Sequence, residues 1–323
     1  MFGIEKLLEK ILNRQNTPKE QREEFDIKTK YVHGLLFYNS YFDKLAAALS
    51  RETVAFIVGG WIRDRLLNRP LGKKIDIDFI VTTDPFEIVK NFQPIVNGQI
   101  FKFEKKEVDA VVASIVFFEN DIKYRFDFSY MDISDILHSD IDFQSKELKI
   151  VERLHENLLN RDFTINAMAV VFDDALGLGA SQTILFDPSN GLEDLQAGIV
   201  RPISYENIKQ DPVRILRGYR IAQELDFDID KEFEKWIKEN KSILKNAPVE
   251  RVRDEILKIF DKENSYKTLD RLIEKGILQE IIPQLKDMLA HKDKEPLHKY
   301  DLITHSKKTL EYLEEYLKKK KVL

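Results

Sequence analysis

A chain of 323 residues is about twice as long as a typical domain, so we expect at least two compact units. The content of 43% hydrophobic and 33% charged residues, with 12 Gly and 10 Pro, excludes a low-complexity or fibrous protein, and the absence of Cys excludes disulfides, Cys-ligated zinc and thiol catalysis. The net charge of −5 by itself argues against a nucleic-acid partner, but residues 201–323 hold 27 Lys and Arg against 24 Asp and Glu, so a basic surface remains available there.

The first segment, Met1–Gln15, has an apolar helical stripe interrupted by charged residues such as Glu5 and Lys10. This pattern predicts a packed helical extension over residues 1–30 and argues against a signal peptide. We find no run of the roughly 18 uncharged apolar residues that a membrane span needs, so no membrane partner is expected. Together with the missing Cys, this favours a cytoplasmic location.

Short β-branched and aromatic runs alternate with helical patterns between Tyr31 and Phe172. The expected strands are Ala55–Val58, Ile75–Thr82, Ala110–Phe118 and Ile122–Phe128. After Ser204 the strand signals stop, and helical periodicity takes over. The expected helices are Pro212–Glu224, Lys231–Glu239, Val249–Phe260, Tyr266–Lys275 and Asp301–Leu317. The predicted fold class is therefore α+β, with a mixed front part and an all-helical rear part.

The first candidate site is the strand-to-helix turn at Gly59-Gly60, with Arg63 one turn into the helix. Glycines let the backbone approach a ligand, and the N-terminus of a helix offers free N–H groups to an anion. The turn is suited to a phosphate. A tight turn followed by a surface arginine is the alternative interpretation.

Asp76 and Asp78 alternate with apolar residues in the next predicted strand. Residues i and i+2 share one face of a strand, so both carboxylates project from the same side. Their mutual repulsion is relieved if a divalent cation lies between them, and all-oxygen ligands suit Mg²⁺. An exposed acidic strand face is the alternative.

A third acid, Asp127, lies within the aromatic strand Ile122–Phe128. A two-metal site could use it as a ligand or as a base. A surface acid is an equally good interpretation of this residue.

Asp211 and Pro212 precede a helix in which Arg214, Arg217 and Arg220 recur every three residues. Asp211 is a plausible N-cap, and Pro212 suits the first helical turn. Such an arginine stripe is usually a solvated face. Behind a phosphate turn and an acid pair, it is better interpreted as a nucleotide clamp.

At this point the sequence resembles the class II tRNA nucleotidyltransferases (CCA-adding enzymes) and the related bacterial poly(A) polymerases of the polymerase β superfamily. The likeness runs from Val54 to Pro283. It is carried by Gly-Gly-x-x-Arg-Asp at 59–64, Asp-x-Asp at 76–78, Arg-Asp-Phe-Thr-Ile-Asn-Ala-Met at 161–168, Asp-Pro-x-x-Gly at 187–191 and Asp-Pro-x-Arg-x-x-Arg-x-x-Arg at 211–220. The segment Glu250–Ile259 is similar to a later helical motif of the family.

The resemblance implies a role for each matching residue. Gly59, Gly60 and Arg63 would form the triphosphate turn, and Asp76 and Asp78 would hold two Mg²⁺ ions. Arg161 together with Asp162 would contact the phosphate and the ribose. Asp211 and Arg214 would read the base, with support for the nucleotide from Arg217 and Arg220. Gln210 stands where the family has an acid, which leaves the nucleotide preference open.

The implied base-reading pair has a physical basis. Cytosine and adenine both present an amine donor beside a ring-nitrogen acceptor, so one carboxylate and one guanidinium can pair with either base. Guanine and uracil present the opposite order. They would leave Asp211 and Arg214 unpaired, at a cost of about 1–3 kcal/mol for each buried group.

The resemblance implies a polymerase-β-like nucleotidyltransferase head with a mixed sheet, followed by a helical neck and body. We expect the head at 31–175, the neck at 176–262 and a body, complete or truncated, at 263–323. The implied activity is template-independent addition of C or A to the 3′ end of tRNA, with tRNA, ATP and CTP as partners. A poly(A) polymerase and an inactive RNA-binding module are the alternatives.

The segment His298–Ser306 is similar to the beginning of a histidine–aspartate hydrolase domain. The chain ends before the later His-Asp pair that such a metal site needs. We therefore expect surface histidines here and no second active site.

Overall fold

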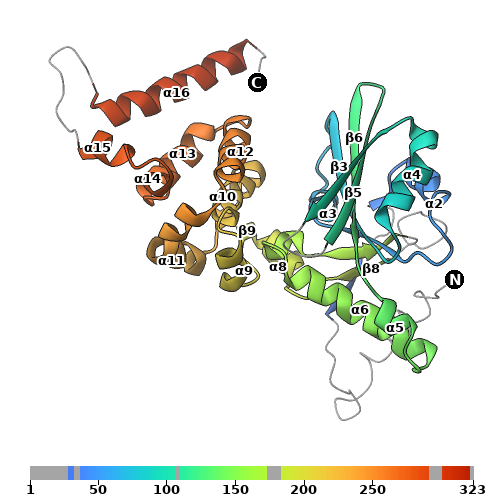
Figure 1. The fold of residues 1–323 in the computed structure, drawn as a ribbon. Helices are drawn as coiled ribbons and strands as arrows, with labels where there is room; N and C mark the ends of the chain where they lie inside the picture. The colour runs from blue at the N-terminus through green and yellow to red at the C-terminus, as the bar shows by residue number, and fades with distance from the viewer. Residues whose placement is uncertain (1–27, 33–36, 106–109, 173–182, 291–299, 321–323) are drawn as a thin grey trace. The chain divides into compact units, whose positions relative to one another are not determined.

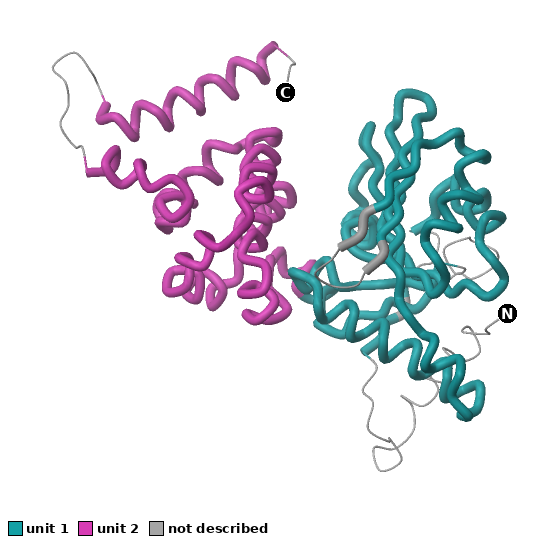
Figure 2. Tube along the Cα trace, in the orientation of Figure 1, with its two compact units in different colours: residues 1–193 teal, residues 194–323 magenta. Residues whose placement is uncertain are grey.

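A computed structural model describes residues 28–32, 37–105, 110–172, 183–290 and 300–320 (Figure 1). The chain divides into two compact units, residues 1–193 and residues 194–323 (Figure 2). The predicted helix in Met1–Gln15 lies outside the described residues, and the expected limits of head, neck and body stay predictions. Among the described residues, no helix combines the length and the apolar character needed to cross a bilayer.

The first unit is built on a mixed sheet of eight strands in the order β1-β8-β7-β2-β3-β6-β5-β4 (Figure 1). The strands are β1 Thr29–Val32, β2 Ala55–Val58, β3 Lys74–Val81, β4 Gln99–Lys105, β5 Ala110–Glu119, β6 Ile122–Tyr130, β7 Ala169–Val171 and β8 Thr183–Phe186. β3 and β6 run parallel, whereas the other neighbouring pairs are antiparallel. The four predicted strands are confirmed as β2, β3, β5 and β6, and the α+β class is confirmed with them.

The first unit also contains helices, of which residues 60–66 contact β2 and β3 and residues 85–96 contact β4, β5 and β6. They are α2 Phe42–Ala46, α3 Gly60–Leu66, α4 Pro85–Val96, α5 Ser134–Leu137, α6 Phe143–Leu159 and the 3-10 turn η3 Thr164–Asn166, with α8 Gly191–Ala197 at the boundary between the units. From α4, the ring of Phe92 stacks on Phe126 of β6 and meets Phe117 of β5 edge-on. Phe79 of β3 stacks on Phe128 of β6. This aromatic core leaves the opposite face of β3 and β6 to polar side chains.

The second unit is mainly helical. Its helices are α9 Tyr205–Gln210, α10 Arg214–Leu225, α11 Lys231–Asn240, η4 Lys241–Asn246, α12 Val249–Phe260, α13 Ser265–Glu274, α14 Leu278–Ile281, α15 Leu285–Ala290 and α16 Leu302–Lys319. The five predicted helices are confirmed, with ends that differ by at most two residues. A short parallel pair, β9 Ile199–Val200 with β10 Asp228–Ile229, was not predicted. The core is formed by residues such as Ile215, Phe233 and Ile259, which are fully buried.

The start of α10 differs from the prediction. The helix begins at Arg214 with Val213 as its N-cap, and Asp211 instead ends α9 as its C-cap. The backbone N–H of Arg214 donates to the carbonyl of Asp211 at 3.0 Å, and that of Ile215 donates to the carbonyl of Pro212 at 3.0 Å. A tight turn therefore precedes the helix. It leaves the Asp211 carboxylate free of any capping duty and able to bind side chains.

The histidine-containing segment near residue 300 is described only from Tyr300 onward. There, Asp301 caps α16 by accepting a hydrogen bond from the Thr304 N–H at 2.9 Å. His305 lies in the first part of α16 and is exposed. An aspartate that caps a helix and an exposed histidine agree with the expectation of a surface segment.

Candidate functional site

The turn between β2 and α3 brings a glycine against two of the predicted site residues. Gly59 has φ 77° and ψ −141°, a conformation that side chains rarely adopt. A Cβ at this position would lie 3.0 Å from Asp78 Oδ2 and 3.0 Å from Arg161 Nη1. Only glycine allows both this backbone conformation and the close approach of the two side chains. The turn therefore places the predicted phosphate residues and one predicted metal ligand side by side.

The acidic face of β3 is formed as the sequence predicts. Ile75, Ile77 and Phe79 are buried. Between them, Asp76 is exposed and Asp78 is half-buried. The Asp76 carboxylate forms an ion pair with Lys74 Nζ at 3.0 Å on the same strand face. The two carboxylates thus share one face of the strand, and the ammonium group of Lys74 lies next to Asp76 on that face.

The third predicted acid lies in register with the second. Asp78 of β3 pairs with Asp127 of β6, and Asp76 pairs with Arg125. Arg125 Nε donates to Asp127 Oδ1 at 2.9 Å. Burial lowers the pKa of Arg125, but the hydrogen bond and charge of Asp127, together with the charges of Asp76 and Asp78, raise it overall. The negative charges of all three carboxylates therefore act on the same guanidinium, that of Arg125.

This donor set fits a divalent cation that also binds substrate phosphates. In the described residues, no group of three or more His, Asp or Glu side chains is arranged to hold a metal ion. The two carboxylates of β3 are hard oxygen donors on one face. Mg²⁺ is usually held by one or two carboxylates plus phosphate oxygens, so two carboxylates on one strand face are enough to fit such an ion, and the role of Asp76 and Asp78 as its ligands stays a prediction.

Arg63 lies in a different environment from the one that its predicted phosphate contact suggests. Its side chain is only 8% exposed. Nη1 donates to Asn166 Oδ1 at 2.8 Å, and Nε donates to Asp64 Oδ1 at 2.9 Å. Asn166 Nδ2 in turn donates to Asp162 Oδ1 at 3.2 Å. The guanidinium joins α3 to η3, a role that sequence reasoning missed; its phosphate contact stays a prediction.

Asp162 is buried within the same network. Its Oδ1 also accepts a hydrogen bond from the Phe163 N–H at 2.7 Å, so this carboxylate fixes the turn that follows α6. Arg161, the preceding residue, places its guanidinium beside Gly59. The motif therefore has Arg161 at the glycine turn and Asp162 in the buried network. The predicted contact of Arg161 and Asp162 with phosphate and ribose stays a prediction.

Asp187 is an anchor whose motif was noticed in the sequence without an assigned role. Its buried carboxylate accepts hydrogen bonds from the backbone N–H of Gly191 at 2.6 Å and of Leu192 at 3.0 Å. Burial raises its pKa, although these two hydrogen bonds oppose the rise. A Cβ on Gly191 would lie 2.2 Å from the Thr164 carbonyl oxygen. The motif thus packs the N-terminus of α8 against η3, the turn that also carries Asn166, the partner of Arg63.

In the second unit, the predicted base-reading pair lies together. Arg214 Nε is 3.6 Å from Asp211 Oδ2, and Arg214 Nη1 donates to the Asn207 carbonyl at 3.2 Å. A third side chain, Arg251 of α12, donates from Nη2 to Asp211 Oδ2 at 2.6 Å. Sequence reasoning missed this residue, although it lies in the Glu250–Ile259 segment that resembles a family motif.

The other two arginines of the stripe, Arg217 and Arg220, lie in different environments. Arg217 is exposed. Arg220 is directed at α12, where its Nε donates to Glu255 Oε2 at 2.7 Å, and its Nη1 donates to Glu224 at 3.3 Å. Burial raises the pKa of Glu255, but the charges and hydrogen bonds of Arg220 and Lys258 lower it overall. In this structure Arg220 ties α10 to α12, and its support of a nucleotide stays a prediction.

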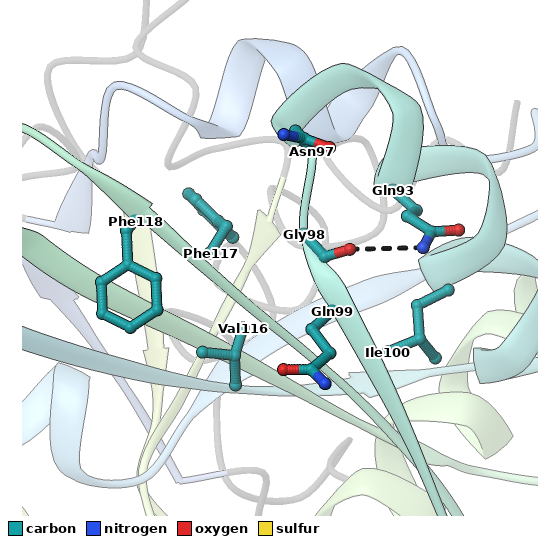
Figure 3. Close-up of a pocket in the computed structure, with 8 residues that line it drawn as sticks. All are labelled: Gln93, Asn97, Gly98, Gln99, Ile100, Val116, Phe117 and Phe118. Carbon is teal, nitrogen blue, oxygen red and sulfur yellow. Dashed lines mark hydrogen bonds between the residues drawn. The ribbon is translucent and has the colours of Figure 1, made fainter.

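A pocket at the edge of the sheet is formed by residues from α4, β4 and β5 (Figure 3). Gln93 Nε2 donates to the Gly98 carbonyl across it at 3.3 Å. The lining residues carry no charge, and none belongs to the acidic face of β3. The pocket therefore offers no charged side chain to a metal ion or to a phosphate.

Comparisons with known proteins agree with this geometry. Residues 55–201 match the poly A polymerase head domain, and residues 226–289 match the probable RNA and SrmB-binding site of polymerase A. The CCA-adding enzyme of Pediococcus pentosaceus is 31% identical over 251 residues, which are 77% of this chain and 56% of that protein.

Solved structures show the same likeness. A tRNA nucleotidyltransferase complexed with a primer tRNA and an incoming ATP analog has a TM-score of 0.55 at 29% identity, over 74% of this chain and 62% of that one. A CCA-adding enzyme in an apo form has a TM-score of 0.62 at 24% identity, over 79% and 56%, which shows the fold alone. The chain spans just over half the length of the first curated relatives. Divalent-metal use is general in such nucleotidyltransferases, and the acidic face of β3 fits it.

Proposed function

We propose that this chain, which belongs to the nucleotidyltransferase family that shares the poly A polymerase head domain, adds C, A or both to the 3′ end of tRNA. The observation that carries the proposal is the cluster formed by Asp78, Arg161 and Gly59, with Asp76 on the same strand face. This cluster unites the glycine turn, a guanidinium and the acidic strand in one place, and we call it the head cluster.

The head cluster supports nucleotidyl transfer in a defined way. Asp76 and Asp78 would hold two Mg²⁺ ions. The metal would stabilise negative charge at the α-phosphate and activate the attacking 3′-hydroxyl. Arg161 lies where it can orient phosphate oxygens through charge-assisted hydrogen bonds. Asp127, whose carboxylate is bound to Arg125, serves as the nearby acid that keeps Arg125 in place and completes the negative face.

The second unit supports recognition of the base and of the RNA. Asp211 accepts hydrogen bonds and Arg214 donates them, so together they match the donor and acceptor order that cytosine and adenine share. The 226–289 segment matches a probable RNA-binding region, and we assign to it most of the tRNA contact. Pyrophosphate would be the second product of the reaction.

The experiment incubates the protein and Mg²⁺ with three forms of one tRNA, which end before CCA, after C and after CC. Each of the four nucleotides is supplied separately, and products are resolved at single-nucleotide length. We expect additions that stop at the natural CCA end. Long adenylate tails from ATP would identify a poly(A) polymerase instead, and binding of tRNA without any extension would identify an inactive RNA-binding protein.

A further inference from the structure

The Asp211 carboxylate is held by an arginine from a different helix. Arg251 lies on α12, 40 residues later in the chain, and its Nη2 is 2.6 Å from Asp211 Oδ2. Arg214, the predicted partner of Asp211, is farther from the same oxygen, with Nε at 3.6 Å. The shorter contact is a charge-assisted hydrogen bond, whereas the longer one is an ion pair without hydrogen-bond geometry.

The two oxygens of this carboxylate differ in their environment. Oδ2 faces the guanidinium groups of Arg251 and Arg214. Oδ1 is buried and accepts no hydrogen bond from any residue that the structure describes. A buried acceptor without a donor is costly, so the protein keeps this orientation only because the contacts at Oδ2 hold it. The exocyclic amine of cytosine or adenine is a donor that would satisfy Oδ1.

The packing of α12 on α10 sets the backbone position of Arg251, whose side chain is 53% exposed. Val252 and Ile259 of α12 are buried. One turn after Arg251, the buried Glu255 accepts a hydrogen bond from Arg220 of α10 at 2.7 Å. The guanidinium of Arg251 therefore reaches Asp211 from a helix whose rotation and height are set by the core of the second unit.

We infer that Arg251 is a positioning residue for nucleotide selection: it holds Asp211 through Oδ2 so that Oδ1 accepts the amine that cytosine and adenine share. This inference rests on the proposed function, because it assigns the discriminating contact to Asp211. Arg251 itself touches neither the base nor the phosphates in this account. Its loss should therefore change the preference among nucleotides, and it should do so only while Asp211 is present.

The test uses the full chain and one tRNA that ends before CCA. The efficiency kcat/KM is measured with CTP, ATP, UTP and GTP for the wild type, Arg251→Ala and Arg251→Lys. Arg253→Ala is the matched control, because Arg253 lies on the same helix and binds Asp254 of its own helix at 2.9 Å. Equilibrium binding of CTP and UTP to each protein without tRNA gives a readout that does not depend on turnover.

We expect Arg251→Ala to lower kcat/KM for CTP about tenfold, the lower limit for loss of a charge-assisted hydrogen bond, and to narrow its margin over UTP by a similar factor. Arg251→Lys should restore part of both. Arg253→Ala removes an arginine from the same RNA-binding segment, so it should change kcat/KM for all four nucleotides by the same factor and keep the wild-type ratio of CTP to UTP. The ratio of CTP to UTP affinity should narrow in the same order across the variants.

A double-mutant comparison completes the test. In an Asp211→Ala background, we expect Arg251→Ala to change the CTP to UTP ratio by less than about twofold, because two residues that act through one contact are not additive. An equal drop for all four nucleotides, or no change at all, would overturn the inference. If the wild type itself shows no preference for C or A, the proposed function fails, and the inference falls with it.

Discussion

Replacing Arg63 by alanine should destabilise the protein, because the side chain is almost fully buried and binds two polar partners. Its truncation removes the hydrogen bond to Asn166 Oδ1 at 2.8 Å and leaves that buried oxygen without a donor. It also removes the contact with Asp64, whose side chain is 31% exposed, so water replaces part of that loss. Together we expect a decrease in the free energy of unfolding of about 2–4 kcal/mol.

Urea denaturation followed by circular dichroism measures this decrease. Arg69→Ala is the matched control, since Arg69 Nη1 lies 3.7 Å from the same Asp64 oxygen but its side chain is 34% exposed. This half-exposed pair, at a distance too long for a hydrogen bond, contributes about 0–1 kcal/mol. The reasoning is refuted if Arg63→Ala keeps the stability of the wild type and weakens all four nucleotides equally, because Arg63 would then act at the phosphate.

Three further predictions concern base selection, the glycine turn and pH. Arg214→Ala should lower kcat/KM for the preferred nucleotide about 10- to 150-fold and narrow its margin over UTP and GTP, and an unchanged ranking and ratios would rule out base reading. Gly59→Ala should lower the unfolding free energy by about 1–3 kcal/mol and remove most of the activity. Gly60→Ala should fold normally, because its Cβ would come no closer than 3.6 Å to another side chain. Equal stability of the two variants would contradict the geometry of the turn. Burial lowers the pKa of His155 from 6.5 to about 4, so protonation of this side chain favours the unfolded state. The unfolding free energy should therefore keep its highest value above pH 6.5 and decrease by up to about 3 kcal/mol as the pH falls toward 4. Urea titrations at pH 7.5 and 5 measure this decrease, and His155→Gln should remove it.

The sequence predicted β2, β3, β5 and β6 from their β-branched and aromatic runs, but it missed β1, β4, β7 and β8. In β3, polar and apolar residues alternate, so both its location and its acidic face could be predicted. β7 Ala169–Val171 and β8 Thr183–Phe186 are short and buried throughout, and such runs show no alternation that separates a strand from a buried helix. Pairing with β2 and with each other determines their structure, and this pairing is not visible locally.

The candidate site shows the same limit. The Asp76–Asp78 pair and the Gly59 turn are local patterns, so the sequence was sufficient to find them. The partner of Arg63 lies 103 residues later, at Asn166, and the partner of Asp211 lies 40 residues later, at Arg251. A side chain's burial and its distant partners depend on how the elements pack. Sequence reasoning therefore did not find the buried network that holds Arg63, whose phosphate contact stays a prediction, and it missed Arg251 altogether.

The most direct test of the central claim compares Asp76→Ala and Asp78→Ala with the wild type in two assays on the same tRNA. One assay measures single-nucleotide extension with CTP or ATP in Mg²⁺, and the other measures tRNA binding by filter retention. The acidic face of β3 predicts that extension by either variant falls by several orders of magnitude while the tRNA dissociation constant changes less than about threefold. Near-normal extension by either variant would contradict the assignment of these two carboxylates to the metal.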